Sequence, residues 1–199
     1  MKPDPAKTWQ TCGGAFLVAI GIFGCFYSAR ASRAHLLYQD AKYGVRREDV
    51  PAVLRACETA HRIYPHNYNF CAWAAEQAYH SRNTVHGEAR ARRLRAAESW
   101  CDVGLALNPF KSQLHLLKAR LLEPLHPRAA AAHWARYVEW HFWEPYNHAV
   151  LVDLYASAGD FDHAAESLDW VRGSEHYEWA LGRVQDAWKQ ERRRPAPTR

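Results

Sequence analysis

Hydrophobic residues between positions 151 and 168 recur at helical spacing on two faces that are separated by a short polar turn. The first face ends at Gly159, which is suited to the left-handed conformation that commonly follows a helix, and Asp160 is suited to cap the next helix. The spacing predicts an antiparallel helix pair with small residues where the two backbones approach. The residues expected to pack this pair are Leu151, Tyr155, Gly159, Phe161, Ala164 and Leu168.

The spacing of these residues, Leu-x3-Tyr-x3-Gly-x-Phe-x2-Ala-x3-Leu, resembles the signature of the tetratricopeptide repeat, or TPR. Two earlier segments carry the small and large residues of the second helix of that repeat, each followed five residues later by proline. These residues are Val53, Cys57 and Ala60 in one segment and Ala97, Cys101 and Gly104 in the other. The resemblance implies an all-α fold, an α-solenoid of about four TPR-like helix pairs plus a C-terminal capping helix.

The remaining helices are predicted from periodicity, caps and prolines, and they cover residues 35–43, 48–64, 68–79, 112–123, 128–142 and 178–190. Cys57 and Cys101 are equivalent positions in the repeat but are too far apart for its usual period. About ten inserted residues are therefore expected, and the polar stretch 81–88 is expected to hold them in a longer turn. The third unit is the least regular, because His133 and Trp140 stand where the family prefers small residues.

Residues 8–29 contain no charged side chain, and as a helix this run is about 30 Å long, which matches the hydrocarbon core of a bilayer. Trp9 and Tyr27 stand near its ends, where interfacial aromatic residues belong. The run predicts a transmembrane helix at 8–29, after a flexible leader at 1–7 and before a repeat domain at 30–190 and a disordered basic tail at 191–199. A cleaved signal peptide is the alternative.

Small residues on one side of the predicted span are expected to pack against another transmembrane helix, and these are Gly14, Gly21, Cys25 and Ser28. The Lys and Arg residues that follow the span outnumber those before it, which favours a cytoplasmic repeat domain. Bacterial TPR proteins with a single anchor often place this domain in the periplasm. We therefore expect a single-pass protein of the bacterial inner membrane and leave the side of the repeat domain open.

The composition limits the remaining chemistry. A formal net charge of +5 over 199 residues is far below the basic density of a dedicated nucleic-acid binder, so no nucleic-acid partner is expected. Arginine clusters around the 81–88 turn and at 192–194 allow contact with anionic lipid headgroups. Five cysteines without CxxC or zinc spacing argue against a metal or haem cofactor, and no cofactor is expected. Cys71 and Cys101 are expected either to pair or to be small buried residues.

No catalytic constellation is visible, and no enzyme activity is expected. His133 and His141 stand eight residues apart on one predicted helix, whereas a helical metal pair usually has a spacing of four residues. The serines and cysteines have no glycine elbow or oxyanion context.

An aromatic run in the third unit is too wide to be buried inside one helix pair, so part of it is expected to contact a partner. By the resemblance, the first helix of each pair lines a concave face that receives a peptide or a protein surface. The residues expected at the partner are Trp134, Tyr137, Trp140, Trp143, Tyr146, Asp153, Asn69, Glu76 and Tyr79.

The sequence thus predicts a membrane-tethered TPR-like scaffold or adaptor, which mediates protein–protein interaction or the assembly of a membrane-associated complex. Its expected partners are membrane-associated proteins and, through the N-terminal helix, the lipid bilayer. The alternatives are a permanent structural subunit of a larger membrane complex and an enzyme with an unrecognised site.

Overall fold

The computed structural model describes residues 5–44 and 47–193, with side chains from residue 13 onward. This described part of the chain consists of helices joined by short turns and contains no strand. The helices are α1 (Pro5–Tyr43), α2 (Val50–Ile63), α3 (Tyr68–His80), the 3-10 helix η1 (Ser81–Thr84), α4 (Gly87–Leu107), α5 (Ser112–Leu122), α6 (Pro127–Val138), α7 (Pro145–Ser157), α8 (Phe161–Val171) and α9 (Tyr177–Arg193).

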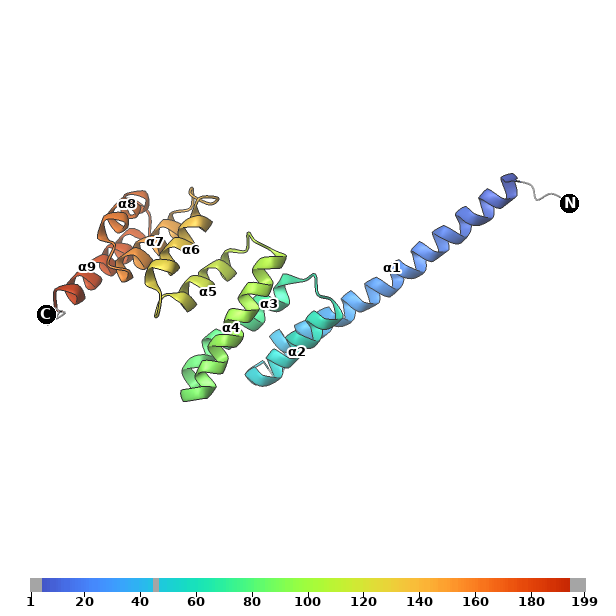
Figure 1. The fold of residues 1–199 in the computed structure, drawn as a ribbon, viewed down its shortest axis with the longest axis horizontal. Helices are drawn as coiled ribbons and strands as arrows, with labels where there is room; N and C mark the ends of the chain where they lie inside the picture. The colour runs from blue at the N-terminus through green and yellow to red at the C-terminus, as the bar shows by residue number, and fades with distance from the viewer. Residues whose placement is uncertain (1–4, 45–46, 194–199) are drawn as a thin grey trace.

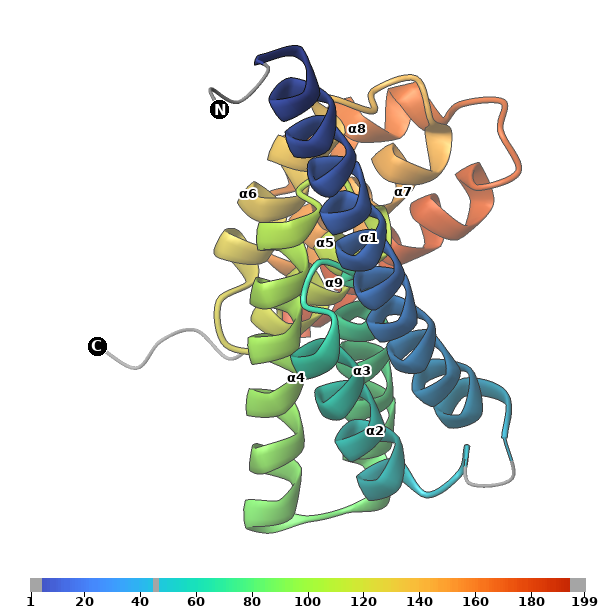
Figure 2. The ribbon, with the colours of Figure 1, turned by 90° about the vertical axis from the view of Figure 1, so that its right-hand side faces the viewer.

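Successive helices form antiparallel pairs, and each pair stacks on the next to give an elongated row (Figure 1). The pairs are α1 with α2, α3 with α4, α5 with α6, and α7 with α8, while α9 packs on both helices of the last pair. The turns within the first two pairs lie at the bottom of Figure 2, and the loops that follow α2, α4 and α6 lie above them. The predicted all-α solenoid with a final capping helix is therefore confirmed.

The α7–α8 turn has the geometry that its sequence predicts. Gly159 has a φ of +73°, and the Asp160 carboxylate accepts a hydrogen bond from the backbone N–H of His163 at 3.3 Å. A left-handed glycine ends α7 and an aspartate caps α8, so the chain reverses within three residues. Leu151 and Ala164 are both buried, and Leu151 belongs to the apolar cluster that α7 forms with α5 and α6.

The second helices of the first two pairs bury their small residues as a stripe. Cys57 lies in α2 and Cys101 in α4, and both side chains are fully buried. The inserted residues do not form the long turn that was predicted over 81–88. Residues 81–84 form η1, and α4 already begins at Gly87, so most of the insertion lengthens α4 by about two helical turns.

The prediction of one helix over 128–142 is wrong at its C-terminal end, because α6 stops at Val138. Side chains from the start of α7 bind the carbonyl groups of the connecting segment. Asn147 donates a hydrogen bond to the His141 carbonyl at 3.0 Å, and His148 donates to the Phe142 carbonyl at 2.7 Å. These bonds hold residues 139–144 as a non-helical loop that carries Trp140 and Trp143.

Helix α1 has two parts with different surroundings. Ala34, Tyr38 and Ala41 are buried against α2 and α3, whereas every described side chain from 13 to 30 is exposed. The exposed part projects away from the other helices (Figure 1). The helix crosses the predicted boundaries at 7 and 29 without a break, and residues 1–4 of the predicted leader lie outside the described residues.

At the other end, α9 extends to Arg193. The first three residues of the segment predicted as a basic tail are therefore helical. Residues 194–199 of that segment lie outside the described residues.

Candidate partner-binding groove

The first helices α3, α5 and α7 line one face of the row, and two cavities follow each other along it. The cavity between α3 and α5 is about 290 Å³ and is lined by Glu76, Tyr79, His80, Gln113, Leu116, Leu117 and Arg120. The cavity between α5 and the α6–α7 loop is about 420 Å³ and is lined by Ser112, Gln113, Leu116, Trp134, Tyr137, His141, Trp143, Glu144, Tyr146 and Asn147. Both cavities share Gln113 and Leu116, so they adjoin along this face, and we call the two together the groove.

The first half of the groove carries a few hydrogen-bonding side chains on a largely apolar surface. The Gln113 side chain donates a hydrogen bond to the Glu76 carboxylate at 2.8 Å, which ties α5 to α3 across the groove floor. Tyr79 lies under the guanidinium group of Arg82, 3.5 Å from the ring centre. This half presents a carboxylate, an amide and a tyrosine ring, which can hydrogen-bond and stack with an extended peptide.

The second half of the groove is aromatic, and its residues differ strongly in exposure. Trp134 is 1% exposed and Tyr137 is 7% exposed, and the Trp134 indole donates a hydrogen bond to the Asn147 carbonyl at 2.9 Å. These two rings form the cavity floor and the core of the third pair. Trp143 is 65% exposed and Tyr146 is 41% exposed, so these two rings form the rim that a partner can touch.

Asp153 is not accessible in the groove, in contrast to its predicted position there. Its side chain is buried beneath α9 and accepts hydrogen bonds from Arg120 of α5 at 2.7 Å and from Arg183 of α9 at 2.5 Å. Ala149 and Ala156 of the same helix are buried too. Helix α9 packs on α7 where the first helix of a fifth pair would lie, so it closes the groove at the fourth pair.

Two further predicted contacts lie outside the groove. Asn69 is exposed in the first turn of α3, where its side chain donates a hydrogen bond to Asn67 at 3.0 Å. Trp140 is 67% exposed and lies against Phe110, with 6.4 Å between ring centres. It lines a third cavity of about 310 Å³, which shares Tyr137 and His141 with the groove.

Sequence reasoning missed Gln113, Leu116 and Arg120, although they supply the α5 side of the groove. Their spacing of three and four residues places them on one face of α5, which was a readable signal. The buried stripe through Leu114 and Leu117 is the stronger pattern in α5. The prediction followed this stripe and did not include the face that carries Gln113, Leu116 and Arg120.

Two histidines are paired behind the groove. His115 donates a hydrogen bond from Nε2 to the Pro109 carbonyl at 2.7 Å, so its Nδ1, 3.2 Å from Nε2 of His133, is left to accept one from that residue. Burial lowers the pKa of His133 to about 4, and burial also lowers the pKa of His115. Both imidazoles are thus held neutral.

His133 therefore pairs with His115, while the ring of His141 stacks on Tyr137. Within the described residues, no group of three or more His, Cys, Asp or Glu side chains is placed to hold a metal ion.

Cys71 and Cys101 are both buried and unpaired in this structure. Burial raises the pKa of Cys71 to about 11 and that of Cys101 to about 12, and it raises the pKa of Cys57 to about 12. Thiols with such pKa values stay protonated at neutral pH and behave as small hydrophobic residues.

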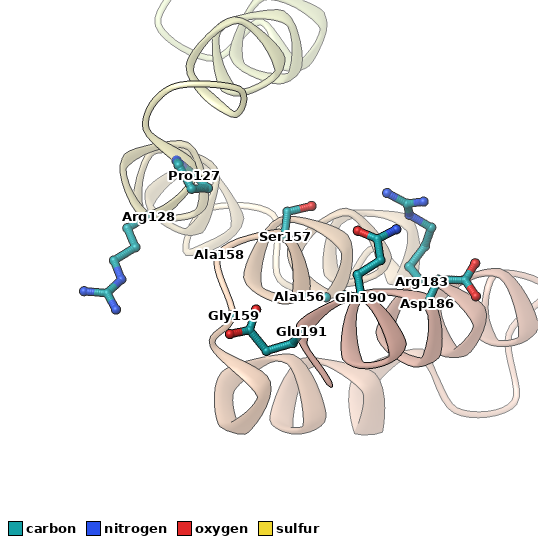
Figure 3. Close-up of a pocket in the computed structure, with 11 residues that line it drawn as sticks. Pro127, Arg128, Ala156, Ser157, Ala158, Gly159, Arg183, Asp186, Gln190 and Glu191 are labelled. Atoms are coloured by element: carbon teal, nitrogen blue, oxygen red, sulfur yellow. The ribbon is translucent and has the colours of Figure 1, made fainter. Parts of the chain in front are cut away.

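A fourth cavity, of about 400 Å³, opens where α9 passes the start of α6 and the end of α7 (Figure 3). Ser157 lies on one side of it, and Arg183, Asp186 and Gln190 lie along α9 on the other. Arg128 points away from the cavity in Figure 3. Its walls are polar and its charged residues have both signs, so it offers no single chemistry to a ligand.

Within the part of the chain that the structure describes, the small residues of the predicted span lie on an open surface. Cys25 and Ser28 are exposed, and a Cβ added at Gly14 or Gly21 would meet nothing within 4 Å. Packing within this chain therefore does not account for them.

Stacked helix pairs of this kind define a TPR-like α-solenoid. No family model matches the sequence, and no curated protein matches it. Among solved structures, TTC0263, a thermophilic TPR protein of Thermus thermophilus, is similar with a TM-score of 0.60 and 19% identity, over 88% of this chain and 95% of that one. The MamA protein is similar with a TM-score of 0.56 and 13% identity, over 84% of this chain and 100% of that one. These likenesses show the fold.

Proposed function

We propose that the protein is a membrane-tethered adaptor that binds a segment of a protein partner in the groove between α3, α5 and the α6–α7 loop. The observation that carries this proposal is that the two cavities adjoin, which places the hydrogen-bonded pair of Glu76 and Gln113 beside exposed aromatic rings. Interfaces between proteins favour this combination, because exposed aromatic rings supply burial and neighbouring polar groups supply specificity.

The membrane tether of this proposal is supported by the first part of α1. The described helix Gly13–Tyr43 contains an 18-residue window with a mean hydropathy of 1.5, and none of that window is buried in the protein. A tether of this kind confines the groove to the membrane surface and raises its effective concentration for membrane partners.

The test uses the full chain, extracted from membranes in mild detergent. The double variant Glu76→Ala and Gln113→Ala removes the polar pair that bridges the groove. We expect it to lose about fivefold or more of the partner that co-purifies with the wild-type protein, which corresponds to about 1 kcal/mol of binding free energy.

The matched control removes an equivalent polar pair away from the groove. Arg95 donates a hydrogen bond to Glu88 at 2.7 Å on the exposed side of α4, and the double variant Glu88→Ala and Arg95→Ala should retain the partner. Equal retention by both double variants would contradict the groove as the binding site.

A permanent structural subunit is the second candidate, and the unpartnered glycines of the span favour it. Native mass measurement of the extracted protein separates the two candidates. A monomer that binds only when partner is added supports the adaptor, whereas a fixed stoichiometry at every dilution supports the subunit.

A further inference from the structure

Exposed aromatic rings gather at one edge of the row. This edge is formed by the loops that follow α2, α4, α6 and α8, which are residues 64–67, 108–111, 139–144 and 172–176. In tandem antiparallel pairs, these loops share one edge and the turns within the pairs share the other (Figure 1). We call the first the aromatic edge, and its exposed rings are Phe110, Trp140, Phe142, Trp143, Tyr146 and Trp170.

The opposite edge is different. Its described turn residues are 44, 47–49, 81–86, 123–126 and 158–160. Among the described residues of these turns and the helix ends next to them, the exposed large hydrophobic side chains are Tyr43, Leu125 and, near the end of α9, Trp188. Packing of the solenoid does not require this asymmetry, because both edges are loops exposed to solvent.

The aromatic edge begins at the base of the apolar part of α1. Arg30, the first charged residue after the charge-free run, donates a hydrogen bond to the Ile63 carbonyl at 2.7 Å. One turn earlier, Tyr27 contacts Tyr64 edge to face, with 5.4 Å between ring centres. The level at which the predicted span ends is therefore the level of the first loop of the aromatic edge.

Contacts between neighbouring loops continue along the edge from this point. The ammonium group of Lys111 lies over the ring of Tyr68, 5.8 Å from its centre, and Phe110 contacts Trp140. Farther along, Tyr146 contacts His176, with 5.4 Å between ring centres. The same edge thus connects the base of the span to the start of α9.

We propose that the aromatic edge lies in the headgroup interface of the bilayer that α1 spans, so that the solenoid rests on the membrane along this edge. The proposal rests on the membrane tether of the proposed function. Tryptophan and tyrosine favour this interface, because their rings are amphipathic and sit at headgroup level. Lys111 adds a cation beside the rings, which suits phosphate groups of the lipids.

The test measures quenching of tryptophan fluorescence in the full chain by lipids brominated in their acyl chains, after reconstitution in nanodiscs. Trp140 and Trp170 lie on the aromatic edge and do not line the groove, so the double variant Trp140→Phe and Trp170→Phe keeps the groove intact. We expect this variant to lose a clear part of the quenching seen in the wild-type protein. Trp9, in the predicted span, contributes equally to every variant.

Trp188 supplies the matched control, because it is 51% exposed near the end of α9 that lies at the opposite edge. Trp188→Phe should leave the quenching unchanged. Equal quenching of the wild-type protein and the double variant would overturn the proposal. A photo-crosslinking residue at position 140 that captures protein instead of lipid in native membranes would overturn it as well.

Flotation of the full chain with liposomes separates this proposal from the tether. Failure of the protein to float with the liposomes would contradict both proposals, the membrane tether and the aromatic edge at the headgroup interface. Flotation together with equal quenching of the wild-type protein and the double variant would contradict only the proposal for the aromatic edge. The tethered adaptor would remain supported.

Discussion

At the scale of single residues, small side chains set how closely the helices of each pair approach. A Cβ added at Gly104 in α4 would lie 2.6 Å from Cδ1 of Leu114 and 3.2 Å from Cβ of Cys71. The sequence predicted this close approach, because Gly104 ends the small-residue stripe of α4. It could not predict the ion pairs of Asp153, since these depend on three helices that are distant in sequence.

Gly104→Ala should destabilise the protein by about 1–2 kcal/mol, because the crowding of Leu114 outweighs the gain in helix propensity. Gly182 in α9 is the control, since an added Cβ there meets nothing within 4 Å. Gly182→Ala should stabilise the protein by up to about 1 kcal/mol. Urea unfolding followed by circular dichroism measures both changes, and equal effects of the two substitutions would refute the packing argument.

His133 gives the stability a dependence on pH. Its pKa is lowered by burial to about 4 in the folded protein, so the unfolded chain takes up a proton first as the pH falls below about 6.5. Stability from this group is therefore complete above pH 6.5 and is lost as the pH falls towards 4. His133→Gln should reduce the stability difference between pH 6.5 and pH 5 by about 1 kcal/mol, allowing for solvent screening.

The exposed His126 is the control for this measurement, and His126→Gln should leave the difference between the two pH values unchanged. The same pH dependence in the wild-type protein and in His133→Gln would exclude His133 as its source.

At the scale of the elements, periodicity predicted most helices, and the exceptions have physical reasons. Helix α6 ends before the predicted residue 142, because Asn147 and His148 bind the loop carbonyls from the next helix. Residues 139–142 carry no proline or glycine that would have signalled this end. The groove prediction was incomplete at the fourth pair for a similar reason, since the burial of Asp153 depends on where α9 docks.

Docking of α9 depends on the fully buried Ala180, which packs with Ala149, Val152 and Val171. Ala180→Glu should detach α9, because a carboxylate in this apolar cluster would be desolvated without a partner. Limited proteolysis should then cut rapidly within residues 172–176. Gln185→Glu, at an exposed position of the same helix, should be cut at the wild-type rate, and protection of both variants would show that α9 docks through other contacts.

At the scale of the whole molecule, the N-terminal helix α1 has two roles, as the predicted span and as the first helix of the solenoid. Its first part is exposed along its length, and its last part supplies the first helix of the first pair. The sequence indicated both roles, since residues 8–29 lack charge and residues 35–43 have helical periodicity. Residues 35–43 were also expected to continue the helix of the predicted span, and one helix of 39 residues joins the two parts without a break.

A variant that lacks residues 1–30 should be soluble and folded, because the buried Ala34, Tyr38 and Ala41 remain. Removal of residues 1–43 should instead unfold the first pair, since α2 then loses its partner helix. Membrane fractionation and circular dichroism measure the two outcomes. A shortened chain that lacks residues 1–30 and still fractionates as an integral membrane protein would contradict the tether.

The unbroken α1 also determines how a tethered groove can search for its partner. A flexible linker would let the groove sweep a wide volume above the bilayer, whereas a continuous helix transmits the tilt and rotation of the span directly to the first pair. The groove would then lie at a fixed distance from the membrane and in a fixed orientation relative to it. Such an adaptor selects partners by how far their binding segment lies from the bilayer, in addition to the chemistry of that segment.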